Sequence, residues 1–216
     1  MKSNFNFDRV SPGWHYDKSR FPRDELSLVS ALTDTESLKP IVEAILKDPY
    51  KEGGVKRIHI GNTVENVSNT VIDNRIAYMK KIGYSENEYF IEFVNDKFPD
   101  LEKLMIEQFN LSYCHSCVII LPPGQNMPVH DDTYSYLNKY MKRDYPDVKY
   151  DPITNIKRYM VMLTDWDWGQ SYGAGNVIKW QWYIGDIFVW KHKLIHWASN
   201  ASLSPLVFYE LTGLEL

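Results

Sequence analysis

Two histidines and one aspartate in the second half of the chain have residue types and spacing suited to holding a metal ion. His130 and Asp132 are two positions apart within the segment 128–132. Alternate residues of a strand point to the same face, so this imidazole and carboxylate can bind one ion together. His196, much further along the chain, can supply a third ligand. Asp131 competes for the carboxylate role, but its side chain is expected on the opposite face.

The chemistry of such a trio depends on what it leaves open. Two imidazoles and one carboxylate on one side of an iron leave three positions free, which is the arrangement of non-haem Fe(II) oxygenases. Oxygen and a bidentate cosubstrate can then meet on the metal. The carboxylate suits a hard Fe(II) ion, and neutral imidazoles bind it without being oxidised as thiolates would be. The alternative is a pH-sensitive structural cluster or three unrelated residues.

The elements that must position these residues are short strands. From about residue 112 the hydrophobic period changes from 3.6 to 2, and turn residues such as 122–124, 173–176 and Gly185 separate the runs. Seven strands at this spacing predict an antiparallel sandwich or barrel, a class to which the jelly roll belongs. The predicted strands are Cys117–Leu121, Met127–Thr133, Lys157–Thr164, Asn176–Trp182, Asp186–Trp190, Leu194–Ala198 and Leu206–Thr212.

The first half of the chain has mainly helical signals. A helix capped by Ser37 is predicted to run to Asp48-Pro49, and another to start near Pro99. A third is predicted from Ser85, where Glu88 completes a capping box. Short strands are expected at 55–60 and 67–72. No linker separates the halves, so we expect one α+β domain over 1–216, with 1–110 as a helical buttress and 111–216 as the β core.

Composition excludes several classes of protein. The 216 residues carry a formal charge of -4, which argues against general nucleic-acid binding. We find no apolar run suited to a signal peptide or a membrane span, and therefore expect a cytoplasmic protein that does not bind membranes. Two cysteines, Cys114 and Cys117, exclude a disulfide framework. They precede an apolar run, so half-buried strand cysteines are expected rather than a redox or metal pair.

At this point the sequence resembles a family. Residues 120–216 look like the double-stranded β-helix Fe(II)/2-oxoglutarate-dependent oxygenases, and are most similar to small members found in phages and marine bacteria. The resemblance implies a jelly-roll core, iron at His130, Asp132 and His196, and 2-oxoglutarate as cosubstrate. The matching elements are 121–124 before 130–132, then 157–159, Asp165-Trp166 with Gly169, Trp182 with Gly185-Asp186, Trp190, His196 with Asn200, and the closing 210–213.

One position departs from the family pattern. Many of these enzymes place an Arg or Lys about ten residues after the distal histidine to bind the far carboxylate of 2-oxoglutarate, and here Leu206 stands there. A dianionic cosubstrate in an apolar barrel needs a cationic partner. Arg158 is the best substitute, on a strand face shared with two methionines. Lys157 should point the other way, Lys191 and Lys193 are weaker candidates, and an ordinary ion pair is the alternative role for Arg158.

Aromatic residues surround the predicted centre. The insert at 133–156 holds five tyrosines interleaved with cations, which suits either a lid that binds substrate or a solvated loop packed on the rest of the protein. Tyr134 is the tyrosine best placed to face the iron. Six tryptophans lie in the last 60 residues, and most are expected to serve packing. Trp180 and Trp182 should share a face, Trp197 should point away from the iron, and Trp190 leads to the distal histidine.

These residues together predict an Fe(II)/2-oxoglutarate-dependent dioxygenase, a hydroxylase of an unidentified small molecule or protein side chain. The carboxylate ligand favours hydroxylation over halogenation, because related halogenases lose it to make room for halide. One alternative is a cupin-like metalloenzyme that does not use 2-oxoglutarate. Another is a non-catalytic jelly-roll binding module whose tryptophans contact sugar or protein.

Overall fold

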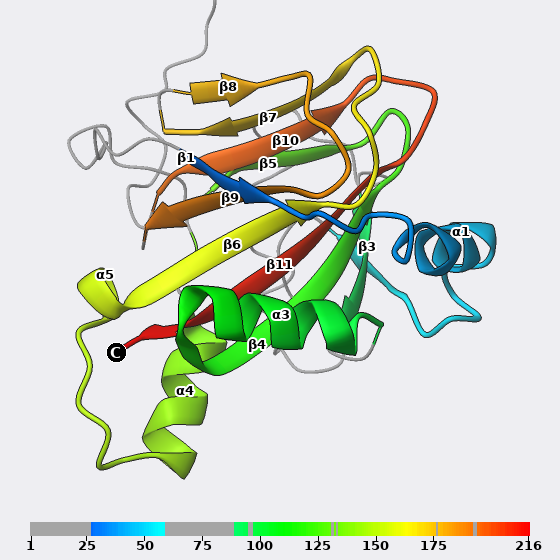
Figure 1. The fold of residues 1–216 in the computed structure, drawn as a ribbon. Coiled ribbons are helices and arrows are strands. Elements are labelled where there is room, and N and C mark those ends of the chain that lie inside the picture. The colour runs from blue at the N-terminus through cyan, green and yellow to red at the C-terminus, as the bar shows by residue number, and fades with distance from the viewer. Residues whose placement is uncertain are drawn as a thin grey trace, which may run out of the picture.

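Two antiparallel sheets make up most of the computed structural model (Figure 1), which describes residues 27–58, 89–94, 97–130, 132, 134–175, 177–191 and 194–216. The seven-stranded sheet has the order β1-β9-β6-β11-β4-β3-β2, and the four-stranded sheet has the order β5-β10-β7-β8. The strands are β1 (Ser27–Ala31), β2 (Val55–Ile58), β3 (Tyr89–Val94), β4 (Leu111–Leu121), β5 (Asn126–His130), β6 (Ile156–Met162), β7 (Gln170–Ala174), β8 (Val177–Lys179), β9 (Asp186–Lys191), β10 (His196–Asn200) and β11 (Leu206–Glu215).

The eight strands from β4 through β11 pair in a nested order. β4 pairs with β11, β5 with β10, β6 with β9, and β7 with β8, so the first strand meets the last and the two middle strands form a hairpin. A chain folded back on itself in this way and divided between two sheets is a jelly roll, or double-stranded β-helix. The fold class expected from the strand pattern is therefore confirmed.

Two helices cover the outer face of the larger sheet. α1 (Lys39–Lys47) buries Val42 and Ile45, and α3 (Pro99–Phe109) lies across β4 and β11 and buries Leu101 and Met105. The sequence predicted both helices, but Ser37 makes no side-chain capping bond, and Leu38 is the N-cap of α1. These helices are the buttress of the jelly roll.

One predicted helix is wrong. The segment that follows Ser85 is strand β3, which pairs with β2 on one side and β4 on the other. Residues 85–88, with the expected capping box, lie outside the described part of the chain, as does the expected strand at 67–72. Phe90 is buried on the inner face of the sheet and Ile91 and Phe93 on the outer one. A strand buried on both faces is apolar at nearly every position, so its sequence mimics a helix periodicity.

The space between the two sheets is filled by apolar side chains. Met160, Met162 and Phe208 of the larger sheet meet Tyr172 and other residues of the smaller one. Leu206, at the position where a cation was sought, is fully buried in this cluster. The interior around Leu206 is therefore a packed apolar core.

The insert between β5 and β6 contains α4 (Ser135–Asp144) and the short α5 (Pro152–Asn155). α4 buries Leu137 and Met141 against Ile156 and Leu214, at the ends of β6 and β11. Tyr140 and Tyr150 pack at the edge of this cluster, and the Tyr150 hydroxyl donates to Asn138 at 2.8 Å. The tyrosines therefore fasten an ordered helix to the end of the barrel.

The clustered tryptophans divide into packed and exposed residues. Trp182 and Trp190 are buried between the sheets, Trp166 packs against the same core, and Trp197 lies against Gly173. Most of them serve packing, as expected. The prediction that Trp180 and Trp182 share a face is wrong. Strand β8 ends at Lys179, and Gln181, between the two tryptophans, has a left-handed backbone (φ 63°). Trp182 is 2% exposed, Trp180 is 61% and Trp168 is 79% exposed.

Two further expectations concern single features. Cys114 and Cys117 are half-buried residues of β4 that form no disulfide, as predicted, and burial raises the pKa of the Cys114 thiol to about 12. Within the described residues, no helix combines the length and the apolar character needed to cross a bilayer.

Candidate metal centre

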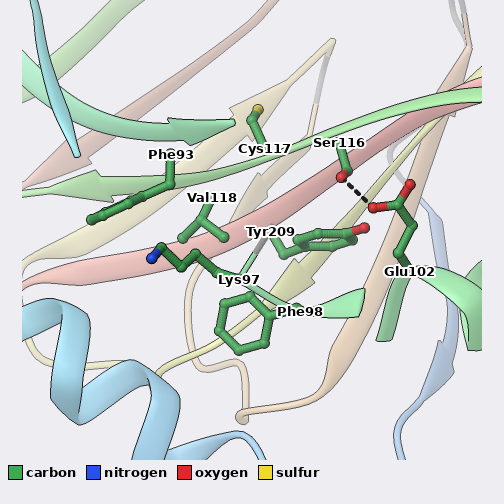
Figure 2. Close-up of a pocket in the computed structure, with 8 residues that line it drawn as sticks. All are labelled: Phe93, Lys97, Phe98, Glu102, Ser116, Cys117, Val118 and Tyr209. Atoms are coloured by element: carbon green, nitrogen blue, oxygen red, sulfur yellow. Dashed lines mark hydrogen bonds between the residues drawn. The ribbon is translucent and has the colours of Figure 1, made fainter. Parts of the chain in front are cut away.

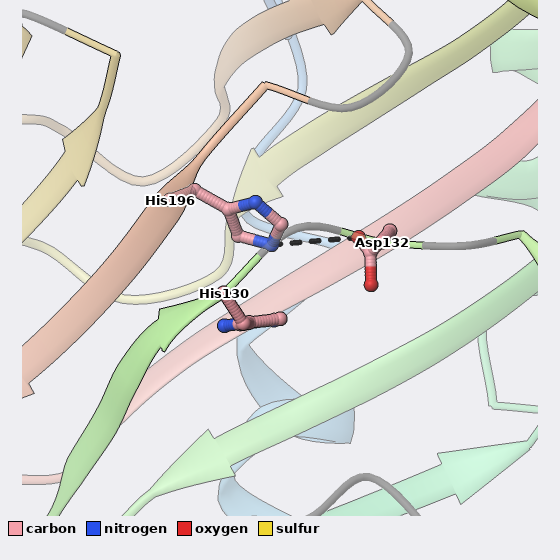
Figure 3. A group of neighbouring side chains, drawn as sticks. All are labelled: His130, Asp132 and His196. Atoms are coloured by element: carbon pink, nitrogen blue, oxygen red, sulfur yellow. Dashed lines mark ion pairs between the residues drawn. The ribbon is translucent and has the colours of Figure 1, made fainter. Parts of the chain in front are cut away.

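The structure brings the three predicted ligands together at one end of the barrel (Figure 3). His130 ends β5, His196 begins β10, and the two residues are paired in the antiparallel register. Asp132 follows β5 directly, before the chain enters α4. One ligand atom from each residue lies within 4.8 Å of the other two. Strand pairing across the smaller sheet therefore joins residues that are far apart in sequence.

The backbone selects the tautomer of both histidines. Nδ1 of His130 lies 2.7 Å from the carbonyl oxygen of Pro128, and Nδ1 of His196 lies 2.9 Å from that of Leu194. A carbonyl oxygen only accepts, so each Nδ1 carries the proton and donates it. The neutral rings then keep their lone pairs on Nε2. A second hydrogen bond that orients the ring in this way is characteristic of metal-binding histidines.

The charge state of His196 also suits a metal ligand. Burial, reinforced by neighbouring His130, lowers the pKa of His196 to about 3, so the ring is neutral at pH 7. Its Nε2 lies 3.4 Å from Oδ2 of Asp132, the contact drawn as an ion pair in Figure 3. With the ring neutral, that contact joins two lone-pair acceptors. A bound cation stabilises such a pair, so this donor set fits a divalent metal.

Arg158 reaches the same carboxylate from the larger sheet. Its Nη1 lies 2.5 Å from Oδ2 of Asp132 and 3.0 Å from Oε2 of Glu210, and its Nε donates to Oγ1 of Thr212 at 3.0 Å. Burial alone would lower the pKa of the guanidinium, but Asp132 and Glu210 raise it well above its ordinary value. The sequence predicted the inward orientation of Arg158 from its strand face, which it shares with Met160 and Met162.

Glu210 and Thr212 received no role from the sequence. They lie on β11 at alternate positions, beside Arg158 on the neighbouring strand, where Thr212 is the register partner of Arg158. Burial raises the pKa of Glu210, and Arg158 opposes that shift. The sequence did contain a signal for the role of Glu210, which is the single acidic residue in the apolar segment Leu206–Leu211. An ionised side chain rarely occupies such a position without a partner.

Aromatic rings form the wall around these polar groups. The Trp190 ring lies 5.4 Å from the His196 ring, and the Tyr172 ring lies 6.4 Å from it. The Trp190 indole nitrogen and the Tyr172 hydroxyl are buried and have no hydrogen-bond partner among the described residues. Burial also raises the pKa of Tyr172 well above its ordinary value, so its hydroxyl keeps its proton. Two unused donors therefore lie beside the histidines.

Tyr134 is also brought to the site, next to Arg158. Its backbone has a left-handed conformation (φ 46°) at the start of α4, and its side chain is buried. The ring lies 5.0 Å from the guanidinium carbon of Arg158, within range of a cation–π interaction. Tyr134 therefore contacts the predicted centre through Arg158.

The other candidate cations are elsewhere or undescribed. Lys157 points away from the barrel interior, as predicted, and pairs with Glu215 at 3.2 Å. Lys193 lies outside the described residues, and so does Asp131, the competing carboxylate. The side chain of Lys191 is likewise not described.

A small pocket lies on the opposite face of the larger sheet, beneath α3 (Figure 2). There the Ser116 hydroxyl donates to Glu102 at 2.7 Å, beside the buried ring of Tyr209. Burial raises the pKa of Tyr209 above its ordinary value. The described lining contains no histidine, so this pocket lacks the ligand set of the centre at the barrel end.

Comparisons with known proteins add little to this geometry. No protein-family model matches the chain, and no curated protein matches it. Among solved structures, a double-stranded β-helix protein from Klebsiella pneumoniae is 17% identical, with a TM-score of 0.31 over 48% of this chain and 70% of that one. A cupin domain from Bordetella pertussis is 15% identical, with a TM-score of 0.32 over 49% and 84% of the two chains.

A predicted oxalate decarboxylase from Thermotoga maritima is 11% identical, with a TM-score of 0.35 over 59% of this chain and 82% of that one. These low scores carry no argument about activity. The assignment of the fold rests on the nested strand pairing described above.

Proposed function

We propose that this protein is an Fe(II)- and 2-oxoglutarate-dependent dioxygenase that hydroxylates a substrate and releases succinate and CO2. The observation that carries the proposal is the convergence of Asp132 with two histidines whose Nδ1 atoms are tied to backbone carbonyls. Two imidazoles and one carboxylate are the ligand set of the non-haem Fe(II) oxygenases. The carboxylate is retained, which favours hydroxylation over halogenation.

The geometry of Arg158 supports a carboxylate-bearing cosubstrate. Among the described residues, its Nε and Nη1 have protein partners, whereas Nη2 has none. The two N–H groups of Nη2 can therefore donate to a carboxylate of 2-oxoglutarate while Glu210 and Thr212 hold the rest of the guanidinium. A charge-assisted interaction of this kind is what a buried dianion requires.

Neighbouring residues would orient and shield the bound groups. Trp190 and Tyr172 offer the unused indole and hydroxyl donors beside His196, and Tyr134 covers one face of Arg158. α4 packs against Ile156 and Leu214 at the same end of the barrel, so we infer that an incoming substrate meets this helix. The substrate, a small molecule or a protein side chain, would have to reach this end of the barrel.

Bound iron and 2-oxoglutarate would supply oxidative chemistry: O2 cleaves the keto acid to succinate and CO2, with one oxygen atom in succinate and the other in the product hydroxyl. The chain's own part is binding, orientation and exclusion of water. Because Nδ1 of each histidine is tied to a carbonyl, neither ring is available as a proton shuttle.

A second candidate is a metalloenzyme with the same ligands that does not use 2-oxoglutarate. Two observations favour it: Leu206 fills the usual position of the anchoring cation, and Arg158 already pairs with Glu210. The exposed rings of Trp168 and Trp180 are the observation that favours the third alternative, a non-catalytic binding module.

One assay separates these candidates. Purified protein supplied with Fe(II), ascorbate, oxygen and 2-oxoglutarate should form succinate slowly even without substrate, and His130→Ala should abolish this. Succinate formation that persists undiminished in His130→Ala removes the proposed site. Iron binding without any affinity for 2-oxoglutarate selects the second candidate, and absence of metal binding selects the binding module. Stimulation of succinate release by added compounds would then identify the substrate.

A further inference from the structure

Arg158 lies between two carboxylates, of which only Asp132 is a candidate metal ligand. The same nitrogen, Nη1, contacts Asp132 at 2.5 Å and Glu210 at 3.0 Å. Asp132 belongs to the group that can hold a metal, whereas Glu210 lies on β11 behind Arg158 and outside that group. Any cation that binds the centre must therefore share Asp132 with a guanidinium that is already in place.

The charges at this end of the barrel show what Glu210 contributes. A histidine that binds a metal does so as the neutral imidazole, so Arg158 supplies one positive charge and the ionised carboxylates of Asp132 and Glu210 supply two negative charges. One unit of negative charge remains to attract a divalent ion. Without Glu210 the balance would be zero, and Arg158 would have Asp132 as its only carboxylate partner among the described residues. A buried arginine in that position both repels a metal and occupies its acidic ligand.

The position of Glu210 suits it for holding Arg158. It is 5% exposed and lies on the inner face of β11, where its Oε2 is also 3.9 Å from Sγ of Cys117. Thr212, two residues further along β11, accepts from Nε of the same arginine. Glu210 and Thr212 therefore grip the guanidinium from one strand, on the side away from the smaller sheet that carries both histidines.

We propose that Glu210 is a positioning residue of the metal centre, which holds Arg158 and neutralises it so that Asp132 stays available to a divalent cation. A bound divalent cation would share Asp132 with Arg158, whose second carboxylate partner is Glu210. A carboxylate has enough lone pairs to bind a metal and still accept from Arg158. This inference rests on the metal-binding part of the proposed function and not on 2-oxoglutarate.

The test is a double-mutant cycle on metal affinity. Co(II) binding is measured by calorimetry and by visible absorption for the wild type, Glu210→Gln, Arg158→Met and the double variant. Glu210→Gln keeps the size of the side chain and should weaken Co(II) binding by about tenfold, the lower end of effects of residues behind a metal ligand. In the Arg158→Met background the same substitution should change affinity by less than about twofold, because there is no guanidinium left to hold back.

Glu102→Gln is the matched control. It removes the same charge from a glutamate of α3, which packs on the other face of the larger sheet, where the partner is the Ser116 hydroxyl. Its Co(II) affinity and spectrum should equal those of the wild type. Far-ultraviolet circular dichroism of each variant checks that the fold is intact. If Arg158→Met does not fold, Arg158→Lys replaces it in the cycle, and the comparison of Glu210→Gln with Glu102→Gln still tests whether Glu210 acts at the centre.

Two outcomes overturn the inference. Unchanged Co(II) affinity in Glu210→Gln removes any role for Glu210 at the centre. An equal loss of affinity in both backgrounds shows that Glu210 acts by its charge alone and not through Arg158. The failure of the proposed function looks different: wild-type protein would bind Co(II) with the expected dependence on Glu210, yet form no succinate from 2-oxoglutarate.

Discussion

A carboxylate lies against each face of the larger sheet, Glu210 of β11 on the inner side and Glu102 of α3 on the outer side, but the two sites differ in what surrounds the acid. On the inner face Glu210 pairs with Arg158, close to Asp132 and both histidines. On the outer face Glu102 accepts from a neutral hydroxyl beneath α3, and it forms no ion pair with the residues that the structure describes. The same sheet thus has a cluster of charged groups and candidate metal ligands on one side, and on the other a single carboxylate held by a hydroxyl group.

The difference lies in the partners and not in burial alone. A carboxylate held by a hydroxyl needs no compensating charge when it is half-buried, and among the described residues Glu102 belongs to no group that could hold a metal. A carboxylate that shares an arginine with a second acid belongs to a coupled set of residues. In such a set, the effect of one substitution depends on whether the other residues are intact. Perturbation of the inner face should therefore alter chemistry, whereas perturbation of the outer face should alter stability only slightly.

The largest effect is expected from removal of a ligand. Asp132→Ala and His196→Ala should each weaken Co(II) or Mn(II) binding by more than about 100-fold, since loss of a residue behind a ligand already costs about 10- to 100-fold. Calorimetric titration measures this directly. Near wild-type affinity in either variant would contradict the assignment of the centre to the inner face.

Metal addition should stabilise the protein through the same ligands. At a metal concentration 100 times the dissociation constant the gain is about 2.7 kcal/mol, which corresponds to a rise in melting temperature of about 5–10 °C for a chain of this size. Differential scanning fluorimetry with Co(II) and with added chelator checks the shift. Glu102→Gln should show the full shift and His196→Ala none; an equal shift in both would place metal binding elsewhere.

Removal of the buried cation should affect the cosubstrate. Arg158→Met should raise the KM for 2-oxoglutarate by about 10- to 100-fold, because hydrogen bonds to a charged group contribute about 1.5–3 kcal/mol. Lys157→Met, one residue away on the opposite face and paired with Glu215, is the control and should leave this KM unchanged. Equal KM values for the two variants would show that Arg158 does not bind 2-oxoglutarate.

The smallest effect is expected on the outer face. Glu102→Gln keeps an oxygen that can accept from Ser116, so its unfolding free energy should fall by less than about 1 kcal/mol. Urea denaturation followed by tryptophan fluorescence measures this. A loss of several kcal/mol would show that the Glu102 charge supports the sheet, and the two faces would then be more alike than their contacts indicate.

The core of the fold was predictable because its strands alternate. The inner-face residues Arg158, Met160 and Met162 repeat with period 2, and the pairing of His130 with His196 agrees with the expected metal trio. β7 was missed because Gln170–Ala174 is short and contains a polar residue and a glycine. Tyr172, whose hydroxyl lies among the unused donors, was missed with it.

Other failures have a different physical origin. The residues of β3 are buried on both faces, so their apolar pattern could not distinguish a strand from a helix. The partnership of Glu210 with Arg158 depends on which strands pair, and β6 and β11 are far apart in sequence. Single-strand patterns predict which face a residue occupies, but not which residue lies opposite on the next strand.

The alternation of Tyr209 and Glu210 on β11 limits how this chain can vary. Tyr209 faces α3 and Glu210 faces Arg158. Insertion or deletion of one residue before them would turn Tyr209 to the inner face and Glu210 to the outer face. Substitutions in β11 can be tolerated singly, but a change of length within it would damage both faces together. Natural length variation among related chains should therefore fall in the loop that precedes β11 and spare the middle of the strand.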